Sequence, residues 1–206
     1  MQHAKHKKIK HLNLVIAWSF FLSVLAFLAT FFFPSPDFSK DIPVYSEGAA
    51  NCFAVSMALF IFGCTVMAIK LAEEQQTLAA SGFTMMAIAM GFVYVLQFVT
   101  TTTTESLNDV YKINDGGTYL LTPAMFLIAC YTVFPRWLNV LGVMATLPQV
   151  IVCIIFLSSG YNHVLDILEF ISMILFNVTA LCWGIFVLKG MRKELKELKE
   201  MNVPEL

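Results

Sequence analysis

The sequence predicts an all-α fold, a polytopic membrane bundle of six transmembrane helices with the N- and C-termini cytoplasmic. Of the 206 residues, 58% are hydrophobic and only 13% are charged, which is far less charge than a soluble domain carries. The apolar residues come in blocks of about 20, the length that a helix needs to cross a bilayer. The predicted spans are residues 12–33, 49–71, 76–100, 117–134, 137–158 and 164–188.

The first block follows four lysines, as the apolar part of a secretion signal would. Its apolar stretch is longer than that of a signal peptide, and no cleavage site of small residues precedes Pro34. We therefore expect a retained first helix.

Lysine and arginine are divided unequally between the two predicted sides of the membrane. Eleven lie on the side of the termini, and only Lys40 and Lys112 lie on the other. This bias predicts a multi-pass protein of the plasma membrane (a bacterial inner membrane) with both termini in the cytoplasm. The basic ends are suited to contact anionic membrane lipids, and they are too short and too mixed in sign to indicate nucleic-acid binding.

The second and third spans carry small residues four positions apart, Ala54 with Ala58 and Ala87 with Gly91. Such pairs are typical of faces on which membrane helices pack closely. The third span leads into a polar stretch, residues 101–116, that we expect to form a long outer loop.

The fourth and fifth spans each contain a proline, Pro123 and Pro148, which we expect to kink them. Gln149, directly after Pro148, is placed to satisfy backbone groups that the kink frees. The sixth span is predicted to continue as a solvated helix, because Glu and Lys recur every three or four residues beyond it. The chain thus divides into a transmembrane domain, residues 1–190, and a short charged cytoplasmic tail, residues 191–206.

No cofactor or metal site is expected. The spans hold no lysine at mid-membrane for a retinal Schiff base and no pair of histidines for haem. The five cysteines are scattered without a CxxC pair and are interpreted as small apolar fillers.

Polar residues recur in the predicted outer half of four spans, where they predict a ligand-binding vestibule open to the outer face. Asp166 and Glu169 are the only acids within the six spans, and acids in a membrane are functional candidates by default. Asp166 has a second interpretation as a first-turn acid that stabilises a helix start, whereas Glu169 lies one turn deeper. The predicted ligand-binding residues are Asn51, Tyr94, Gln97, Tyr119, Thr122, His163, Asp166 and Glu169.

Two segments, Gly91–Gln97 and Phe134–Gly142, resemble uncharacterised bacterial six-helix integral membrane families. In those families a tyrosine-rich third helix and a Pro-Arg-Trp-Leu turn are common, and the resemblance implies the fold but no activity. The six-helix count with both termini inside is also similar to the vitamin-binding S components of energy-coupling-factor transporters. That similarity implies a ligand that enters from the outer side.

Three functions follow as hypotheses. The first is binding or transport of a small, largely apolar or cationic ligand in the outward vestibule. The second is an intramembrane enzyme acting on a lipid or isoprenoid, with Glu169 or Asp166 as the catalytic general acid. The third is a non-catalytic accessory or immunity protein that works as a homo-oligomer or binds a cytoplasmic partner through residues 191–206. Whether the protein is an enzyme stays open at this point.

Overall fold

The computed structural model describes residues 2–34, 46–102, 107–130, 133–159 and 163–201. The described part consists of α-helices and one short 3-10 helix, without strands, which confirms the predicted all-α fold. The helices are α1 (Gln2–Ala29), η1 (Thr30–Phe32), α2 (Glu47–Glu73), α3 (Thr77–Thr102), α4 (Leu107–Cys130), α5 (Arg136–Ser159) and α6 (His163–Met201).

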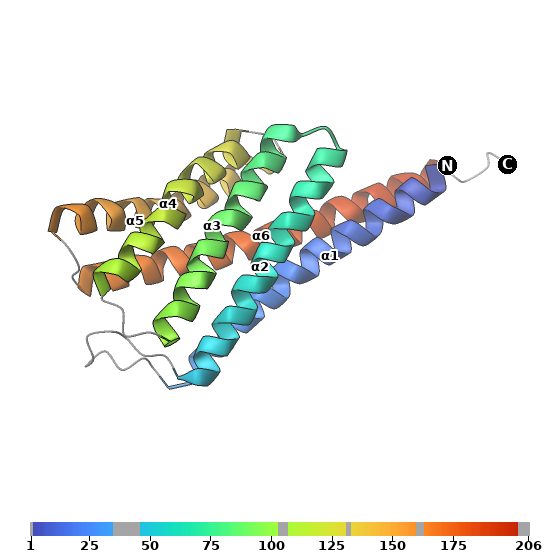
Figure 1. The fold of residues 1–206 in the computed structure, drawn as a ribbon. Helices are drawn as coiled ribbons and strands as arrows, with labels where there is room; N and C mark the ends of the chain where they lie inside the picture. Colours follow the sequence, from blue (N-terminus) through green and yellow to red (C-terminus); the bar gives the residue numbers. More distant parts are fainter. Residues whose placement is uncertain (1, 35–45, 103–106, 131–132, 160–162, 202–206) are drawn as a thin grey trace.

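The six α-helices close into a ring of neighbours. Each helix packs against the next one along the chain, and α1 packs against α6. Successive helices run in opposite directions, and α1 and α6 lie side by side and project together toward the two termini (Figure 1). We call this end of the bundle, where α1 begins and α6 finishes, the terminal end, and the opposite end the distal end.

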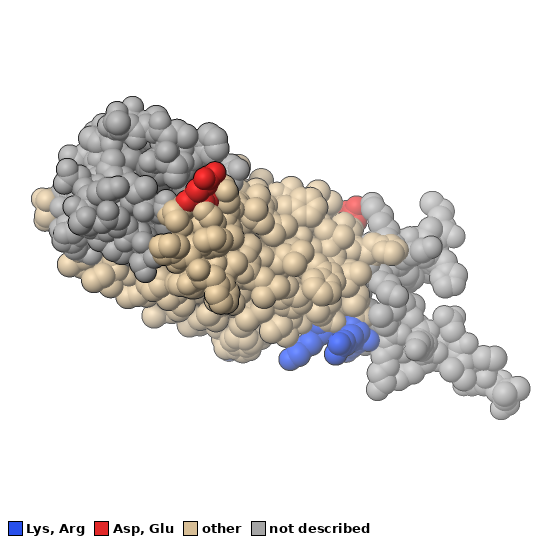
Figure 2. All heavy atoms as spheres, turned by 90° about the horizontal axis from the view of Figure 1, so that it is seen from below, with Lys and Arg blue, Asp and Glu red and all other residues tan. Residues whose placement is uncertain are grey.

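Four helical segments are long and apolar enough to cross a membrane, which agrees with a membrane-embedded bundle. In α3 and α4 the described apolar stretches, Thr77–Phe92 and Tyr119–Cys130, are shorter. Large apolar side chains such as Leu157, Phe126 and Ile154 are exposed, as suits a surface that faces lipid. Figure 2 shows a face whose middle is uncharged, with Lys and Arg gathered toward one end. The four segments are His11–Phe32, Glu47–Glu73, Arg136–Ser159 and Ile167–Lys193.

The predicted long outer loop, residues 101–116, is wrong. Helix α3 continues to Thr102 and α4 already begins at Leu107, so most of this stretch is helical. A helix satisfies its own backbone hydrogen bonds and extends into water without an apolar surface, and the stretch contains no proline to stop it. The predicted helical continuation beyond the sixth span is confirmed, since α6 runs to Met201.

The turn between α2 and α3 is built from side-chain and backbone contacts at the terminal end. Lys70 and Glu74 form an ion pair of 2.7 Å across one helical turn. Gln75 then adopts a positive φ of 62°, and the N–H of Gln76 donates to the Leu71 carbonyl at 2.8 Å. This left-handed residue with its returning hydrogen bond is a Schellman-type helix end, which lets α3 reverse direction within three residues.

Close helix crossings use small residues, but not the predicted pairs. Gly63 of α2 lies against Phe20 and Ser19 of α1, and Gly82 of α3 lies against the backbone of α4 at Ala124. Ala58 is exposed, and a Cβ on Gly91 would meet nothing within 4 Å. The prediction of close packing at Ala54/Ala58 and Ala87/Gly91 is therefore wrong, because four-residue spacing does not say which face of a helix meets a neighbour.

Candidate functional site

Helix α6 buries one continuous stripe of side chains, and Glu169 lies on it. Leu165, Ser172, Phe176 and Trp183 follow one another at intervals of seven, four and seven residues, and all are buried. Such spacing places them on one face of the helix. Glu169 stands between Leu165 and Ser172 on that face and is half-buried. The opposite face carries exposed apolar residues, namely Val164, Ile167, Phe170, Ile171, Ile174, Val178, Leu181 and Ile185.

The stripe packs on α5 in a well-defined antiparallel register. The Ser172 hydroxyl donates a hydrogen bond of 2.8 Å to the main-chain carbonyl of Ala145. Seven residues toward the distal end on each helix, Val152 and Leu165 are both fully buried in one small apolar cluster. Interpolating between these two pairings by the helical rise places Glu169 opposite Pro148.

Pro148 changes the backbone chemistry of α5 at the level of Glu169. Proline has no N–H, so the carbonyl four residues earlier, that of Met144, loses its usual helical donor. The adjacent carbonyl of Ala145 is the one that accepts the Ser172 hydroxyl. A carboxylate, a hydroxyl and the Ala145 carbonyl therefore belong to the same short stretch of the α5–α6 interface. We call this group, Glu169, Ser172, Pro148 and the carbonyl of Ala145, the α5–α6 oxygen cluster.

Of the other predicted site residues, Asn51 and Tyr119 face away from the interior. Asn51 shares its face of α2 with the exposed residues Val55 and Phe62. Tyr119 is 61% exposed and shares its face of α4 with Phe126. An exposed tyrosine near the end of an apolar stretch is typical of the aromatic belt at a membrane surface. The structure thus does not bring Asn51 and Tyr119 together with Glu169.

Thr122 is half-buried, one turn before the buried Met125 of α4. The remaining four predicted residues, Tyr94, Gln97, His163 and Asp166, are in helices α3 and α6, and their side chains lie outside the described residues. Among the described side chains, Glu169 and Thr122 are the predicted residues that are withdrawn from the surface. Glu169 also has an interaction partner in the structure, and so does Gln149.

No family model, curated protein or solved structure matches this chain.

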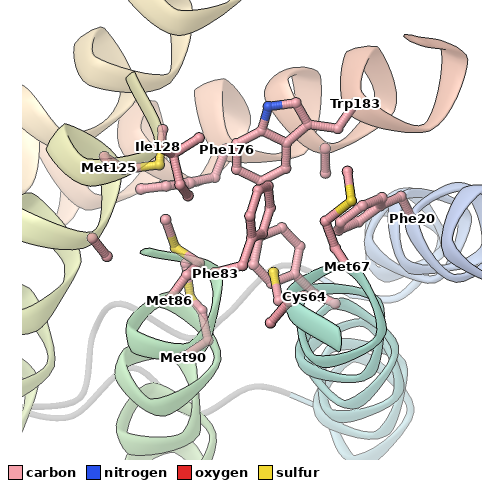
Figure 3. Close-up of a cluster of buried hydrophobic side chains, with 14 of the residues drawn as sticks. Phe20, Cys64, Met67, Phe83, Met86, Met90, Met125, Ile128, Phe176 and Trp183 are labelled. Carbon is pink, nitrogen blue, oxygen red and sulfur yellow. The ribbon is translucent and has the colours of Figure 1, made fainter. Parts of the chain in front are cut away.

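The terminal half of the bundle is closed by aromatic side chains. Trp183 is 1% exposed, and its ring lies 5.0 Å from that of Phe83 and 5.8 Å from that of Phe134, measured between centroids. Figure 3 shows Trp183 reaching from α6 toward Phe83, with methionines from α3 and α4 packed beside them. Fourteen residues separate Trp183 from Glu169, about 21 Å along the helix. We call the rings that surround and include Trp183 the aromatic cluster: Phe20, Phe60, Phe83, Phe134 and Trp183.

Sequence reasoning missed Ser172 as a member of the site. Its signal was present, because Ser172 follows Glu169 by three residues and so shares its helix face. What the sequence lacked was the identity of the opposing helix, since the bond to Ala145 depends on the register between α5 and α6.

Proposed function

We propose that this protein binds or transports a small, largely apolar or cationic ligand that enters between the distal halves of its helices. In this proposal the Glu169 carboxylate pairs with the positive charge of the ligand. Exposed and half-buried apolar residues around the site would contact the rest of the ligand.

The position of Glu169 is the observation that carries the proposal. The carboxylate is half-buried on the interior face of α6, between the buried residues Leu165 and Ser172. An acid on the interior face of a membrane-spanning helix is costly unless a positive charge or hydrogen bonds compensate it. Such residues in membrane bundles mark the pathways of ions and ligands.

The aromatic cluster supports entry from the distal end. It joins rings from α1, α2, α3 and α6 with Phe134 of the α4–α5 connection, so five segments meet at the terminal half of the bundle. Tightly packed rings leave little room for a polar ligand to pass. A ligand that reaches Glu169 in this state of the protein would therefore come from the distal end.

We also propose that the terminal end lies in the cytoplasm. The described helices carry eleven lysines and arginines at that end, Lys70 and Arg136 among them, and one, Lys112 of α4, at the distal end. This distribution supports the positive-inside orientation. Labelling of single cysteines in intact cells with a membrane-impermeant maleimide tests it: a cysteine at position 47 should react in whole cells, and one at position 193 only after lysis. The reverse pattern would contradict the orientation.

Thermal unfolding of the purified protein in detergent tests the ligand. Decyltrimethylammonium, a cation with an apolar chain, should raise the melting temperature of the wild type more than decanol, its uncharged counterpart. Glu169→Gln should remove the difference, because the amide carries no charge to pair with the ammonium group. Glu47→Gln is the matched control, since Glu47 is an exposed acid at the same end of the bundle. Equal stabilisation of the wild type and Glu169→Gln across a panel of amines and lipophilic cations would refute the proposal.

A further inference from the structure

We infer that the terminal part of α6 carries a binding site for one anionic phospholipid, whose phosphate contacts Lys189 and Arg192. The acyl chains of this lipid lie along the exposed apolar residues that precede Lys189 on the same face of α6. The lipid binds on the outer surface of the bundle, separately from the ligand proposed to pair with Glu169.

One face of α6 changes from apolar to basic at Lys189. Val178, Leu181 and Ile185 are exposed large apolar residues, and Lys189 and Arg192, which are also exposed, continue the same row. The five residues follow one another at intervals of three, four, four and three, which places them on one face of the helix. This face lies opposite the one that α6 buries in the bundle. We call the row Val178, Leu181, Ile185, Lys189 and Arg192 the α6 outer stripe.

The two basic residues of the α6 outer stripe lie at the depth of the lipid headgroups. The apolar part of α6 ends directly before Lys189, so the hydrocarbon core ends near this residue. The headgroup layer is about 5–7 Å thick on each side of a bilayer, and Arg192 lies about 4.5 Å beyond Lys189 along the helix. Both positive charges therefore fall within this layer.

Trp137 supports this depth independently. It is 60% exposed and lies in the first turn of α5, as is typical of the aromatic residues at a membrane surface. Just before it, the ring of Phe134 lies 5.5 Å from that of Phe186 on α6, measured between centroids. The start of α5 thus meets α6 one turn before Lys189, and both helices place the membrane surface at a similar level.

The charges of Lys189 and Arg192 are available to a lipid. Ion pairs within a helix join residues three or four positions apart, and at these distances from Lys189 and Arg192 the sequence has no Asp or Glu. The helices packed against α6 on either side, α1 and α5, contain no Asp or Glu at all. Lys70 differs, because it pairs with Glu74 at 2.7 Å. Figure 2 shows Lys and Arg together beside the uncharged surface, apart from the described Asp and Glu of that view.

A phosphate group fits this pair of side chains. Residues three apart on a helix have Cβ atoms about 5–6 Å from each other, a separation that one phosphate can bridge. Arginine offers a phosphate two parallel N–H donors, and lysine adds a compact charge. A zwitterionic lipid brings an ammonium group beside its phosphate, whereas an anionic lipid leaves a net negative charge for Lys189 and Arg192 to neutralise.

The competing explanation is that these residues only add to the diffuse attraction between a basic membrane protein and an anionic surface. Diffuse attraction depends on the total charge at the terminal end. A binding site depends on the two residues that lie in the headgroup layer. Removing equal charge at two places on α6 therefore separates the two explanations.

Native mass spectrometry of the purified full-length protein tests the inference, with equal amounts of phosphatidylglycerol and phosphatidylcholine added in a neutral detergent. We expect the wild type to retain one phosphatidylglycerol in preference to phosphatidylcholine. The double variant Lys189→Gln/Arg192→Gln should bind phosphatidylglycerol about tenfold more weakly or worse, since each basic residue near an anionic headgroup contributes about fivefold. Lys196→Gln/Lys199→Gln is the matched control. It removes the same charge from α6 about 10–15 Å beyond Lys189 and should leave the affinity nearly unchanged.

Equal retention of the two lipids by the wild type would overturn the inference, and so would equal loss of affinity in the two double variants. Glycerol 3-phosphate, a headgroup without acyl chains, should not displace the bound lipid at the same concentration. Displacement would indicate a soluble phosphate ligand and would also overturn the inference. Stabilisation by decyltrimethylammonium is a separate result, because neither Lys189 nor Arg192 takes part in the proposed site at Glu169.

Discussion

The hydroxyl of Ser172 on α6 donates a hydrogen bond of 2.8 Å to the main-chain carbonyl of Ala145 on α5. Both residues are fully buried, and the bond joins two helices at the turn before Pro148. It therefore determines the register that places Glu169 opposite the proline.

Replacing Ser172 by alanine should lower the free energy of unfolding by about 0.5–1.5 kcal/mol, the usual value of a hydrogen bond between membrane helices. Ser81→Ala is the control, because the Ser81 hydroxyl is exposed and bonds only to Thr77 of its own helix. Unfolding of both variants by a denaturing detergent gives the comparison. Equal stability of Ser172→Ala and the wild type would show that the bond does not hold the register.

Gly82→Ala should destabilise the packing of α3 on α4. A Cβ at this position would lie 2.9 Å from the Ala124 carbonyl oxygen and 2.8 Å from Ile128 Cγ1. Because the first of these atoms belongs to the backbone, the helices must move apart, at a cost of about 1–3 kcal/mol. Gly91→Ala in the same helix meets nothing within 4 Å and should be neutral or stabilising by up to about 1 kcal/mol. Thermal unfolding of the pair measures the difference, and the same loss for both would contradict the close approach.

Trp183→Ala should cost about 3–5 kcal/mol, because it leaves a cavity among the rings of the aromatic cluster. Trp137 is 60% exposed, and Trp137→Ala should cost far less. A scan of unfolding against detergent composition measures both variants. If they lose the same stability, the aromatic cluster is not what closes the terminal half of the bundle.

Gln75→Gly should stabilise the protein by about 1 kcal/mol. Gln75 is the one described residue other than glycine with a positive φ, and a side chain in that region clashes with its own backbone. Gln75→Ala keeps a Cβ and should bring no gain. If the melting temperature rises equally for Gln75→Gly and Gln75→Ala, relief of the positive φ is not the cause of the added stability.

The sequence predicted the helices well where apolar length decides them. Three of the predicted spans agree with helices of the structure to within two residues at both ends, as for 49–71 against Glu47–Glu73. Helices α1 and α4 each begin ten residues before the predicted starts at 12 and 117, and α6 continues past 188 to Met201. The polar residues of 101–116 show that this stretch lies in water, but they do not show whether it is a loop or a helix. Composition alone therefore did not distinguish an outer loop from helix ends that extend into solvent.

The candidate site was predicted in part. The cost of a carboxylate in a membrane singled out Glu169 from the sequence, and the structure places it on the interior face of α6. Asn51 and Tyr119 have a similar predicted depth but face outward, because depth along a helix follows from residue number whereas direction follows from packing.

The sequence by itself thus determined that the chain forms apolar helices, where the apolar parts of these helices lie, and that Glu169 is the exceptional acid. Only the tertiary structure decided that α1 meets α6, that Ser172 bonds to Ala145 and that Pro148 stands opposite Glu169. The physical reason is that whether a segment can span a membrane depends on the number of consecutive apolar residues in it, which can be counted in the sequence. Helix rotation and register depend instead on contacts between residues far apart in sequence, such as Gly82 with Ala124 and Trp183 with Phe83.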